Sequence, residues 1–525
     1  MRGWKLNNKK IFAMYIVLFI APIAFSADFF SNAFSAYQRA MTVSGFTRNS
    51  GIGYKSPSST EMLKVPNAGI WNPKINHHDF GENEELRIGI LPISLWNTVN
   101  SEKAWGGNDG AFWQGRGINT QISAGFELGN DYFLLKLNPI IWASLNLDFE
   151  IISTTSSNGY GDYWTIFDNL QRYGKDPYWG LSYGDSALRF SYNNLTFGFS
   201  NENVIIGPGQ TNNIILGNNA DGFPHFDFGT LAKTDTGLFG DIEFRWLWGF
   251  LKESEFFDED STNDYAWISG MYATITPKYF ENFTLGFNYQ YYKPLSTWDG
   301  YDLIRGIPLL DFSNSATDYK DMMISLTFQW LFPEVGFEVY GEWARNDNFA
   351  AMDDLFNSPE HTQAYTLGIN QVCLKKGSNV LLLSLELSNL AQERTTNVRA
   401  AGPWYRHAWA GWSQGYTNNG QLLGASIGPG SSSQWAKLSW IDERGLIALS
   451  VQRVSHDKDY YYNIANYLIN ADCFSELNIG LEKLYFLNNI QLYGQLTYVH
   501  YWNNNFLYMN NLNNLHFELG IRYCL

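Results

Sequence analysis

Cysteine is scarce in this chain of 525 residues. Its three cysteines, Cys373, Cys473 and Cys524, are odd in number and lie far apart in the sequence. An odd, widely spaced set excludes a disulfide framework, and it shows none of the spacings that cysteine and histidine have in metal sites. We therefore predict that the protein holds no metal and no other cofactor.

Basic residues are also few. Four of the 35 lysines and arginines lie in an N-terminal signal peptide, which leaves 31 basic against 51 acidic residues and a formal charge of −20. So large an excess of acidic residues argues against nucleic acid and against anionic lipid headgroups as partners.

Apolar runs of any length are missing after the N-terminus. Residues 11–25 form an apolar run behind a basic start, and Ala24 and Ser26 place small side chains at the −3 and −1 positions of a cleavage site. These features predict a secretory signal peptide over residues 1–26. No run of 18 apolar residues follows, which excludes a membrane-spanning helix in the mature chain.

Aromatic residues and glycine, by contrast, are abundant. Aromatic residues make up 17% of the chain against 16% charged residues, and there are 47 glycines. Segments of roughly ten residues alternate between apolar and polar side chains and are separated by Asn, Asp, Gly or Pro. This pattern is typical of a transmembrane β-barrel, so we predict an all-β fold with antiparallel strands over residues 86–525.

The last segment, "HFELGIRYCL" over residues 516–525, shows the alternation best. Phe517, Leu519 and Ile521 fall on one face, whereas His516 and Glu518 fall on the other. One face therefore suits lipid and the other suits a wet lumen. A strand that ends with the chain is typical of barrels in the bacterial outer membrane.

Connection lengths give an independent test of the topology. Counted back from the C-terminus, long connections alternate with short ones such as 375–378 and 193–194, as external loops and periplasmic turns do in such barrels. The alternation predicts about 18 strands in a monomer with both termini periplasmic. Outer-membrane lipid and the outer-membrane assembly machinery are then its surroundings and partners. Residues 27–85 are polar and predict a short periplasmic lead-in segment, with room for one helix near 28–41.

Three segments on the predicted external side, 105–117, 200–230 and 403–435, combine Trp or Tyr with Asn, Gln, Arg, His and many glycines. Aromatic faces stack on sugar rings, polar side chains pair with hydroxyls, and glycines let the backbone approach a ligand closely. This composition predicts polysaccharide binding without catalysis. The candidate binding residues are Asp109, Trp113, Arg116, Asn218, Asn219, His225, Tyr405, His407 and Tyr416.

Several motifs resemble the signature of the capsule assembly Wzi family. They are "NDGAFWQGRG" (108–117), "RYGKDPYWGLSYGDS" (172–186), "FGFSNENVIIGPGQTNNIILGNNADGFPH" (197–225), "YGEWARND" (340–347) and "GYTNNGQLLGASIGPGSSSQ" (415–434). The resemblance implies an outer-membrane barrel that acts as a lectin, holds capsular or other surface polysaccharide, and supports capsule assembly at the cell surface.

Two other classes of function stay open. A porin would want an open, charged lumen, and an outer-membrane enzyme acting on glycan or lipid could use Asp109, Glu202, Asp221 and His225 as acid and base groups. The sequence contains no G-x-S-x-G elbow and no His/Cys cluster that would favour a particular hydrolytic mechanism.

Overall fold

The computed structural model describes eleven stretches of the chain. They are 29–47, 53–62, 70–71, 86–154, 159–165, 167–258, 260–307, 320–346, 357–394, 402–406 and 414–524. The predicted signal peptide, residues 1–26, lies outside them, as does His407.

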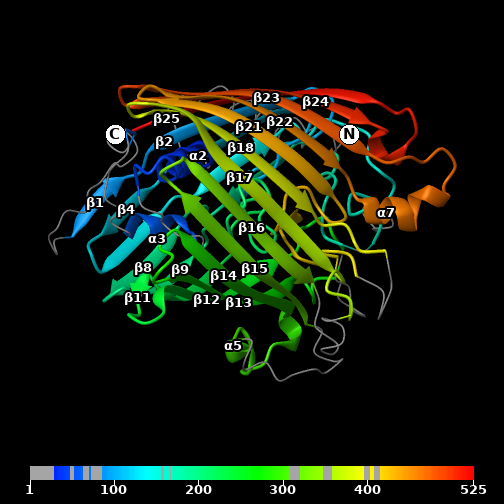
Figure 1. The fold of residues 1–525 in the computed structure, drawn as a ribbon. Coiled ribbons are helices and arrows are strands. Elements are labelled where there is room, and N and C mark those ends of the chain that lie inside the picture. The colour runs from blue at the N-terminus through cyan, green and yellow to red at the C-terminus, as the bar shows by residue number, and fades with distance from the viewer. Residues whose placement is uncertain are drawn as a thin grey trace, which may run out of the picture.

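One antiparallel sheet curves round until its ends meet (Figure 1). β2 (Ile93–Asn100) pairs with β3 (Gly117–Ser123) on one side and with the last strand, β25 (Leu512–Tyr523), on the other. Pairing of the first and last strands leaves no open edge there, which lipid requires of a spanning sheet. The predicted all-β antiparallel barrel is confirmed.

The wall consists of short strands in the first half of the chain and long ones in the second. The short strands are β1 (Arg87–Ile90), β4 (Phe126–Gly129), β5 (Phe133–Leu137), β6 (Ile140–Ser144), β7 (Tyr178–Ser182), β8 (Ala187–Tyr192), β9 (Leu195–Ser200), β10 (His225–Thr230) and β11 (Thr234–Asp235). The long strands are β12 (Gly240–Lys252), β13 (Tyr265–Pro277), β14 (Phe283–Pro294), β15 (Asp321–Phe332), β16 (Phe337–Asn346), β17 (Gln363–Lys376), β18 (Asn379–Asn389), β21 (Ser432–Asp442), β22 (Gly445–Ser455), β23 (Ser475–Leu487) and β24 (Ile490–Trp502).

Several of the short strands are pieces of a longer strand that a kink interrupts. Leu91 and Pro92 separate β1 from β2, and Pro139 lies just before β6. A count of segments therefore differs from a count of barrel strands, and the number of about 18 stays a prediction.

The alternation predicted for the last strand is present in β25. Phe517, Leu519 and Ile521 are exposed on the outer face, while His516 and Glu518 are buried on the inner face. Exposed Leu, Phe and Ile on the outer face continue round the other strands of the wall. An apolar outer face of this kind is what a lipid-spanning barrel presents.

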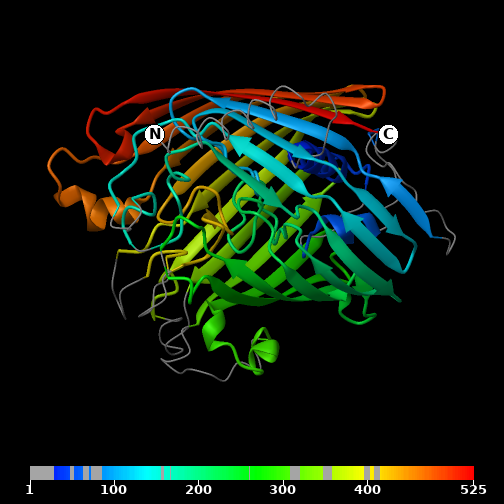
Figure 2. The same cartoon turned by 180° about the vertical axis from the view of Figure 1, so that it is seen from behind.

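The two ends of the barrel differ as the connection lengths predict. Short turns at 193–194 and 377–378 lie at one end, called here the short-turn end. Long connections at the other end, called the long-connection end, include 101–116, 145–177, 201–224 and 390–431. The last of these contains a small hairpin, β19 (Thr417–Asn418) with β20 (Gln421–Leu422). Figure 2 shows described parts of these connections running through the interior of the barrel.

Within the stretches described, helices are few, and none is long and apolar enough to cross a membrane. They are α2 (Phe29–Val43), α3 (Pro57–Met62), α5 (Asp302–Arg305) and α7 (Lys458–Asn463), with 3-10 turns η1 (Leu295–Thr297), η3 (Ala465–Tyr467) and η4 (Asn504–Phe506). α2 covers most of the range in which the sequence allowed one helix.

The N-terminal segment lies inside the barrel at the short-turn end, where α2 and α3 are surrounded by strands (Figure 1). Arg39 of α2 forms an ion pair with buried Glu338 of β16, with 2.8 Å between Nε and Oε2. Beyond α2, the ring of Trp71 stacks on Tyr37 at 4.2 Å, and its Nε1 donates to the carbonyl oxygen of Asp442 in a short turn. This part of the predicted lead-in thus packs against the inner wall.

Candidate functional site

Segments far apart in the sequence meet inside the barrel. We call residues 201–224, with the described residues of 402–431, the plug. Its apolar side chains share one buried core with the wall, which includes Ile206, Ile214, Leu216, Leu423 and Ile427. A plug held by such a core is a fixed part of the fold, so side chains at its surface have defined positions.

Two carboxylates of the wall fix residues 207–214 of the plug, which begin with Gly207-Pro208-Gly209 and are called here the Gly-Pro-Gly loop. Glu386 of β18 accepts hydrogen bonds from the backbone N–H groups of Gln210 (2.7 Å), Thr211 (2.9 Å) and Asn212 (3.1 Å). Glu342 of β16 accepts from the N–H of Ile214 at 3.0 Å. Gly207 starts the turn at a φ of +95°, a conformation that favours glycine. Buried N–H groups need acceptors, and these carboxylates supply them.

Tyr405 and Tyr416 lie fully buried in the centre of the plug. Their rings stack at 5.8 Å with an angle of 19° between planes, and each hydroxyl donates at 2.8 Å to a backbone carbonyl, those of Ile214 and Ile215 respectively. Ring faces and hydroxyls of both tyrosines are thus engaged within the protein. They join the 402–431 connection to the 201–224 connection.

His225, at the start of β10, is also fully buried. Its Nε2 lies 3.0 Å from the hydroxyl oxygens of Tyr54 and Ser200, and its Nδ1 lies 2.8 Å from the carbonyl oxygen of Phe223. Tyr54 belongs to the N-terminal segment. His225 therefore connects that segment to the base of the plug.

The 101–116 connection lies against the plug through asparagines. Asn218 Nδ2 donates to the carbonyl oxygen of Asn108 at 3.1 Å, and Asn219 Nδ2 donates to that of Leu422, also at 3.1 Å. Asn218 is buried, whereas Asn219 is half-buried. Asp109 is buried and accepts from Gln114 Nε2 at 2.9 Å, and burial raises the pKa of its carboxyl to about 7.

Trp113 and Arg116 keep part of their side chains in solvent. Trp113 packs at 4.9 Å against the ring of Tyr173, and its Nε1 donates to Asn146 Oδ1 at 3.3 Å. Arg116 donates to the carbonyl oxygens of Ser101 and Asp148 and pairs with Glu102 at 3.3 Å. Both side chains are held in place with some surface left for a ligand.

The candidates thus separate into two groups. Trp113, Arg116 and Asn219, called here the rim, are partly accessible: the first two lie on the 101–116 connection against residues 145–177, and Asn219 lies on the plug beside Asn108. Asp109, Asn218, His225, Tyr405 and Tyr416 are buried. The carboxylates Glu342 and Glu386 were not among the candidates, although Glu386 is the one acidic residue of β18 and Glu342 shares the inward face of β16 with Glu338. That pattern signals an inward-facing acid with a partner.

Arg406, next to Tyr405, ties three connections together. Its Nη2 lies 2.9 Å from Asp162 Oδ1 and 2.7 Å from Asp457 Oδ2, and all three side chains are buried. Within the stretches that the structure describes, no group of three or more His, Cys, Asp or Glu side chains could hold a metal ion.

The plug should lose stability as the pH rises. Burial raises the pKa of Asp109, Asp168 and Asp221, which lie in three different connections, to about 7 in each case. Their unfolded value is about 3.9, so the folded state binds protons more tightly, and the stability gained is complete below about pH 4 and lost as the pH rises towards 7.

We therefore expect proteases to cleave the plug and its neighbouring connections faster at pH 8 than at pH 5. An acid-tolerant protease is used at pH 5 and a neutral protease at pH 8, and the rate of each is calibrated on an unfolded substrate. Mass spectrometry identifies the cleaved sites. Asp168→Asn keeps an oxygen that can accept from the N–H of Ser254 and should reduce the pH dependence. Equal cleavage at both pH values would contradict the prediction.

Comparisons with known proteins agree with this arrangement. The family model described as capsule assembly protein Wzi matches residues 181–505. No protein with a curated description matches the sequence. The structure is similar to that of Wzi of Escherichia coli, described as an outer membrane protein involved in group 1 capsule assembly and a carbohydrate-binding β-barrel, with a TM-score of 0.63 and 13% identity over 96% of this chain and 100% of that one.

Porin-like barrels resemble the chain less. OccK2 (OpdF) of Pseudomonas aeruginosa has a TM-score of 0.40 and 10% identity over 84% of this chain and 97% of that chain. A BenF-like porin of Pseudomonas fluorescens Pf-5 has a TM-score of 0.39 and 9% identity over 85% and 100%. The family match covers more than half of the sequence and includes the Gly-Pro-Gly loop, Glu342, Glu386 and the 402–431 connection. This outer-membrane β-barrel therefore belongs to the capsule assembly Wzi family.

Proposed function

We propose that the protein binds capsular or other surface polysaccharide at its long-connection end, without altering it, and thereby supports capsule assembly at the outer membrane. The observation that carries the proposal is the rim: Asn219 lies on a plug whose backbone is fixed by wall carboxylates, and Trp113 and Arg116 lie on the 101–116 connection, which is hydrogen-bonded to that plug through Asn108. A preformed, rigid rim binds a flexible polymer with little ordering cost on the protein side.

The two groups of candidates take different roles in this proposal. Trp113 offers a ring face to a sugar, while Arg116 and Asn219 offer N–H donors to its hydroxyls. The buried residues act through the rim: Tyr405 and Tyr416 hold the two connections of the plug, and Asn218 holds the 101–116 connection. The lumen that a porin would need open is occupied by this packed core.

Recognition should depend little on charge. Arg116, Arg172 and Arg406 at this end each pair with an acidic side chain of the protein, so they offer little net charge to a ligand. Binding through stacking and neutral hydrogen bonds is only weakly screened by salt. The affinity for the bound polymer should therefore change less than about threefold between roughly 0.05 and 0.5 M salt.

The direct test is binding of the purified protein to isolated surface polysaccharide by calorimetry, together with the ratio of retained to shed polymer on cells. Trp113→Ala and Asn219→Ala should each weaken binding by about 1–2 kcal/mol, and the double variant by roughly the sum. Tyr467→Ala, which removes an exposed aromatic on another connection, is the matched control. Unchanged binding by a folded double variant would contradict the proposal, and shortened polymer would favour an enzyme.

A further inference from the structure

Outward-facing residues of β13 and β14 are buried, which is unusual for a wall that meets lipid. The inward-facing Ile268, Tyr272 and Tyr292 pack on the plug, so Trp267 and Tyr291, one position away, face outward. Yet Tyr291 is fully buried and Trp267 almost so. The cover is the connection after β14. Residues 295–307, called here the flap, include η1 and α5, and α5 lies outside the barrel beneath β12 and β13 (Figures 1 and 2).

Side chains of the wall hold the flap in place. Trp248 Nε1 donates to the carbonyl oxygen of Leu303 at 2.9 Å, and the hydroxyl of Tyr291 donates to that of Asp302 at 2.8 Å. Trp298 of the flap packs edge-on against Trp267 at 5.9 Å. These bonds satisfy backbone groups of the flap, which is necessary where water is absent.

Two of the three charged side chains of the flap, Asp302 and Arg305, are turned inward against the wall, whereas Asp299 is 55% exposed and lies 3.7 Å from Arg305 Nη2. Lys293 Nζ lies 3.1 Å from Asp302 Oδ2, and Arg305 Nη1 lies 2.8 Å from Asp302 Oδ1. Lys293 and Asp302 have fully buried side chains, and that of Arg305 is nearly so. Ion pairs enclosed in this way leave Asp299, next to Trp298, as the one charged side chain on the outer surface of residues 295–307, and the exposed face of α5 carries none.

The flap also reaches far along the wall. Gly306 packs on Trp246 and Ser269 so closely that no side chain would fit. Trp246 precedes the end of β12, Lys252, by six positions, which corresponds to about 20 Å along the strand at roughly 3.3 Å per residue. An apolar band of about 25 Å surrounds such barrels, so even with strand tilt the flap extends into the outer part of this band.

Apart from Ser296 and Asp299 at its start, the outer surface of the flap is apolar and continues the surface that faces lipid. Trp298, Leu303 and Ile304 are 41%, 47% and 40% exposed, much like Leu285 of β14 and Leu326 of β15 on the wall, at 42% and 53%. We propose that the flap is embedded among the acyl chains of the outer leaflet, as a part of a surface connection that folds back into the membrane. This proposal does not depend on polysaccharide binding.

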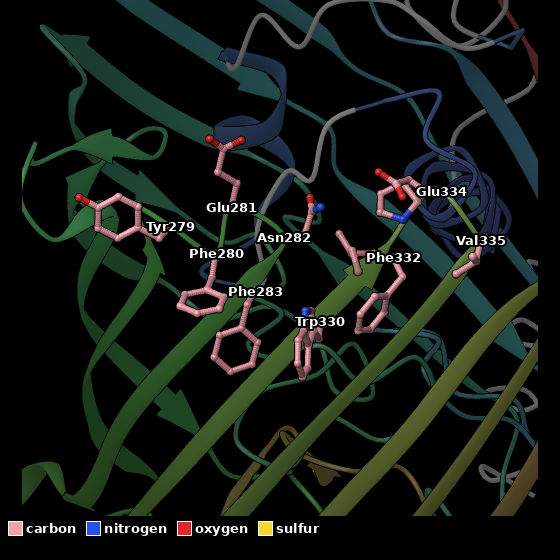
Figure 3. Close-up of a pocket in the computed structure, with 11 residues that line it drawn as sticks. Tyr279, Phe280, Glu281, Asn282, Phe283, Trp330, Phe332, Glu334 and Val335 are labelled. Atoms are coloured by element: carbon pink, nitrogen blue, oxygen red, sulfur yellow. The ribbon is translucent and has the colours of Figure 1, made fainter.

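Another aromatic group on the outer side lies at the opposite end of the wall. Figure 3 shows a hollow at the short-turn end lined by Tyr279, Phe280, Phe283, Trp330 and Phe332, among others. Exposed aromatic residues at this level match the ordinary girdle at a membrane interface. The flap differs because it covers the wall with a separate segment, so its position is a property of this chain and not of barrels in general.

The test measures how deep the flap lies in a bilayer. In a variant whose three cysteines are replaced, nitroxide labels are attached at Leu303→Cys or Ile304→Cys, with Leu519→Cys as the lipid reference and Tyr467→Cys, 78% exposed, as the water reference. In phosphatidylcholine vesicles, the rate at which each nitroxide collides with oxygen is divided by the rate at which it collides with a water-soluble nickel complex. This ratio should be as high for the labels at 303 and 304 as for the label at 519. A ratio like that at 467 would overturn the proposal.

A second measurement uses the unaltered chain. Lipids that carry a photoreactive diazirine on the acyl chain should label the peptide that contains residues 295–307, as they label β25. Absence of label in the flap, with β25 labelled, would overturn the proposal. If the labels at 303 and 304 were shielded from both oxygen and nickel, and a chemical cross-linker captured dimers, a second copy of the chain would cover this face. That result would also overturn the proposal.

Discussion

Replacing Asp227 by leucine should destabilise the barrel more than any other single change considered. Asp227 of β10 is fully buried between Arg189 of β8 and Arg245 of β12, with 2.7 Å between Arg189 Nη2 and Asp227 Oδ2. Removing it leaves two buried guanidinium groups without their shared carboxylate, which costs about 3–5 kcal/mol. We expect a lower urea midpoint in vesicles and loss of the compact band in unheated gels.

A compensating variant separates charge from packing. Asp227→Leu combined with Arg189→Met and Arg245→Met removes all three charges and keeps most of the volume, so much of the lost stability should return. Asp260→Asn, on an exposed connection, is the control and should leave the midpoint unchanged. A wild-type midpoint for Asp227→Leu would show that this ion cluster contributes nothing to the barrel.

The second large effect is expected at Glu386. Glu386→Ala removes the acceptor of three backbone N–H groups in the Gly-Pro-Gly loop and of the Tyr340 hydroxyl at 2.8 Å. Buried donors left without partners cost about 1–3 kcal/mol each, so the displaced loop should become at least roughly a hundredfold more populated. We expect faster proteolysis within 201–224, higher ion conductance in planar bilayers, and weaker polysaccharide binding.

Glu386→Gln is the matched control, because its amide oxygen can still accept from part of the loop. It should give effects between those of wild type and alanine. The barrel itself should remain, since Glu386 lies on a strand whose backbone pairs with β17 and β21 on either side. Unchanged conductance and proteolysis for a folded Glu386→Ala variant would show that the loop is held without this carboxylate.

The barrel could be predicted from the sequence because its signals are local. Alternation in a strand such as β25, and the difference between a turn at 193–194 and a connection of many residues, need no knowledge of distant contacts. The strand kinks at Leu91–Pro92 and before β6 were missed, because proline and glycine mark interruptions as readily as they mark turns.

The candidate site could be predicted only in part. The segments around Trp113, Asn219 and Tyr405 do come together, as their shared composition indicated, but composition does not tell a rim residue from a buried one. Tyr405 is suited to stacking on a sugar, yet its ring stacks on Tyr416 and its hydroxyl reaches Ile214. Whether Tyr405 binds a ligand or packs inside the plug depends on contacts between residues far apart in the sequence, and periodicity and spacing carry no information about such contacts.

Attachment of the plug to the wall by Glu342 and Glu386 has a mechanical consequence. A polymer at a cell surface is dragged by the surrounding fluid, and under the proposed function that force reaches the loop over residues 210–214. The carboxylates pass it to β16 and β18, each of which is paired on both sides with a neighbouring strand. Tension then spreads round a closed sheet, where many hydrogen bonds resist it together, instead of unravelling one exposed loop.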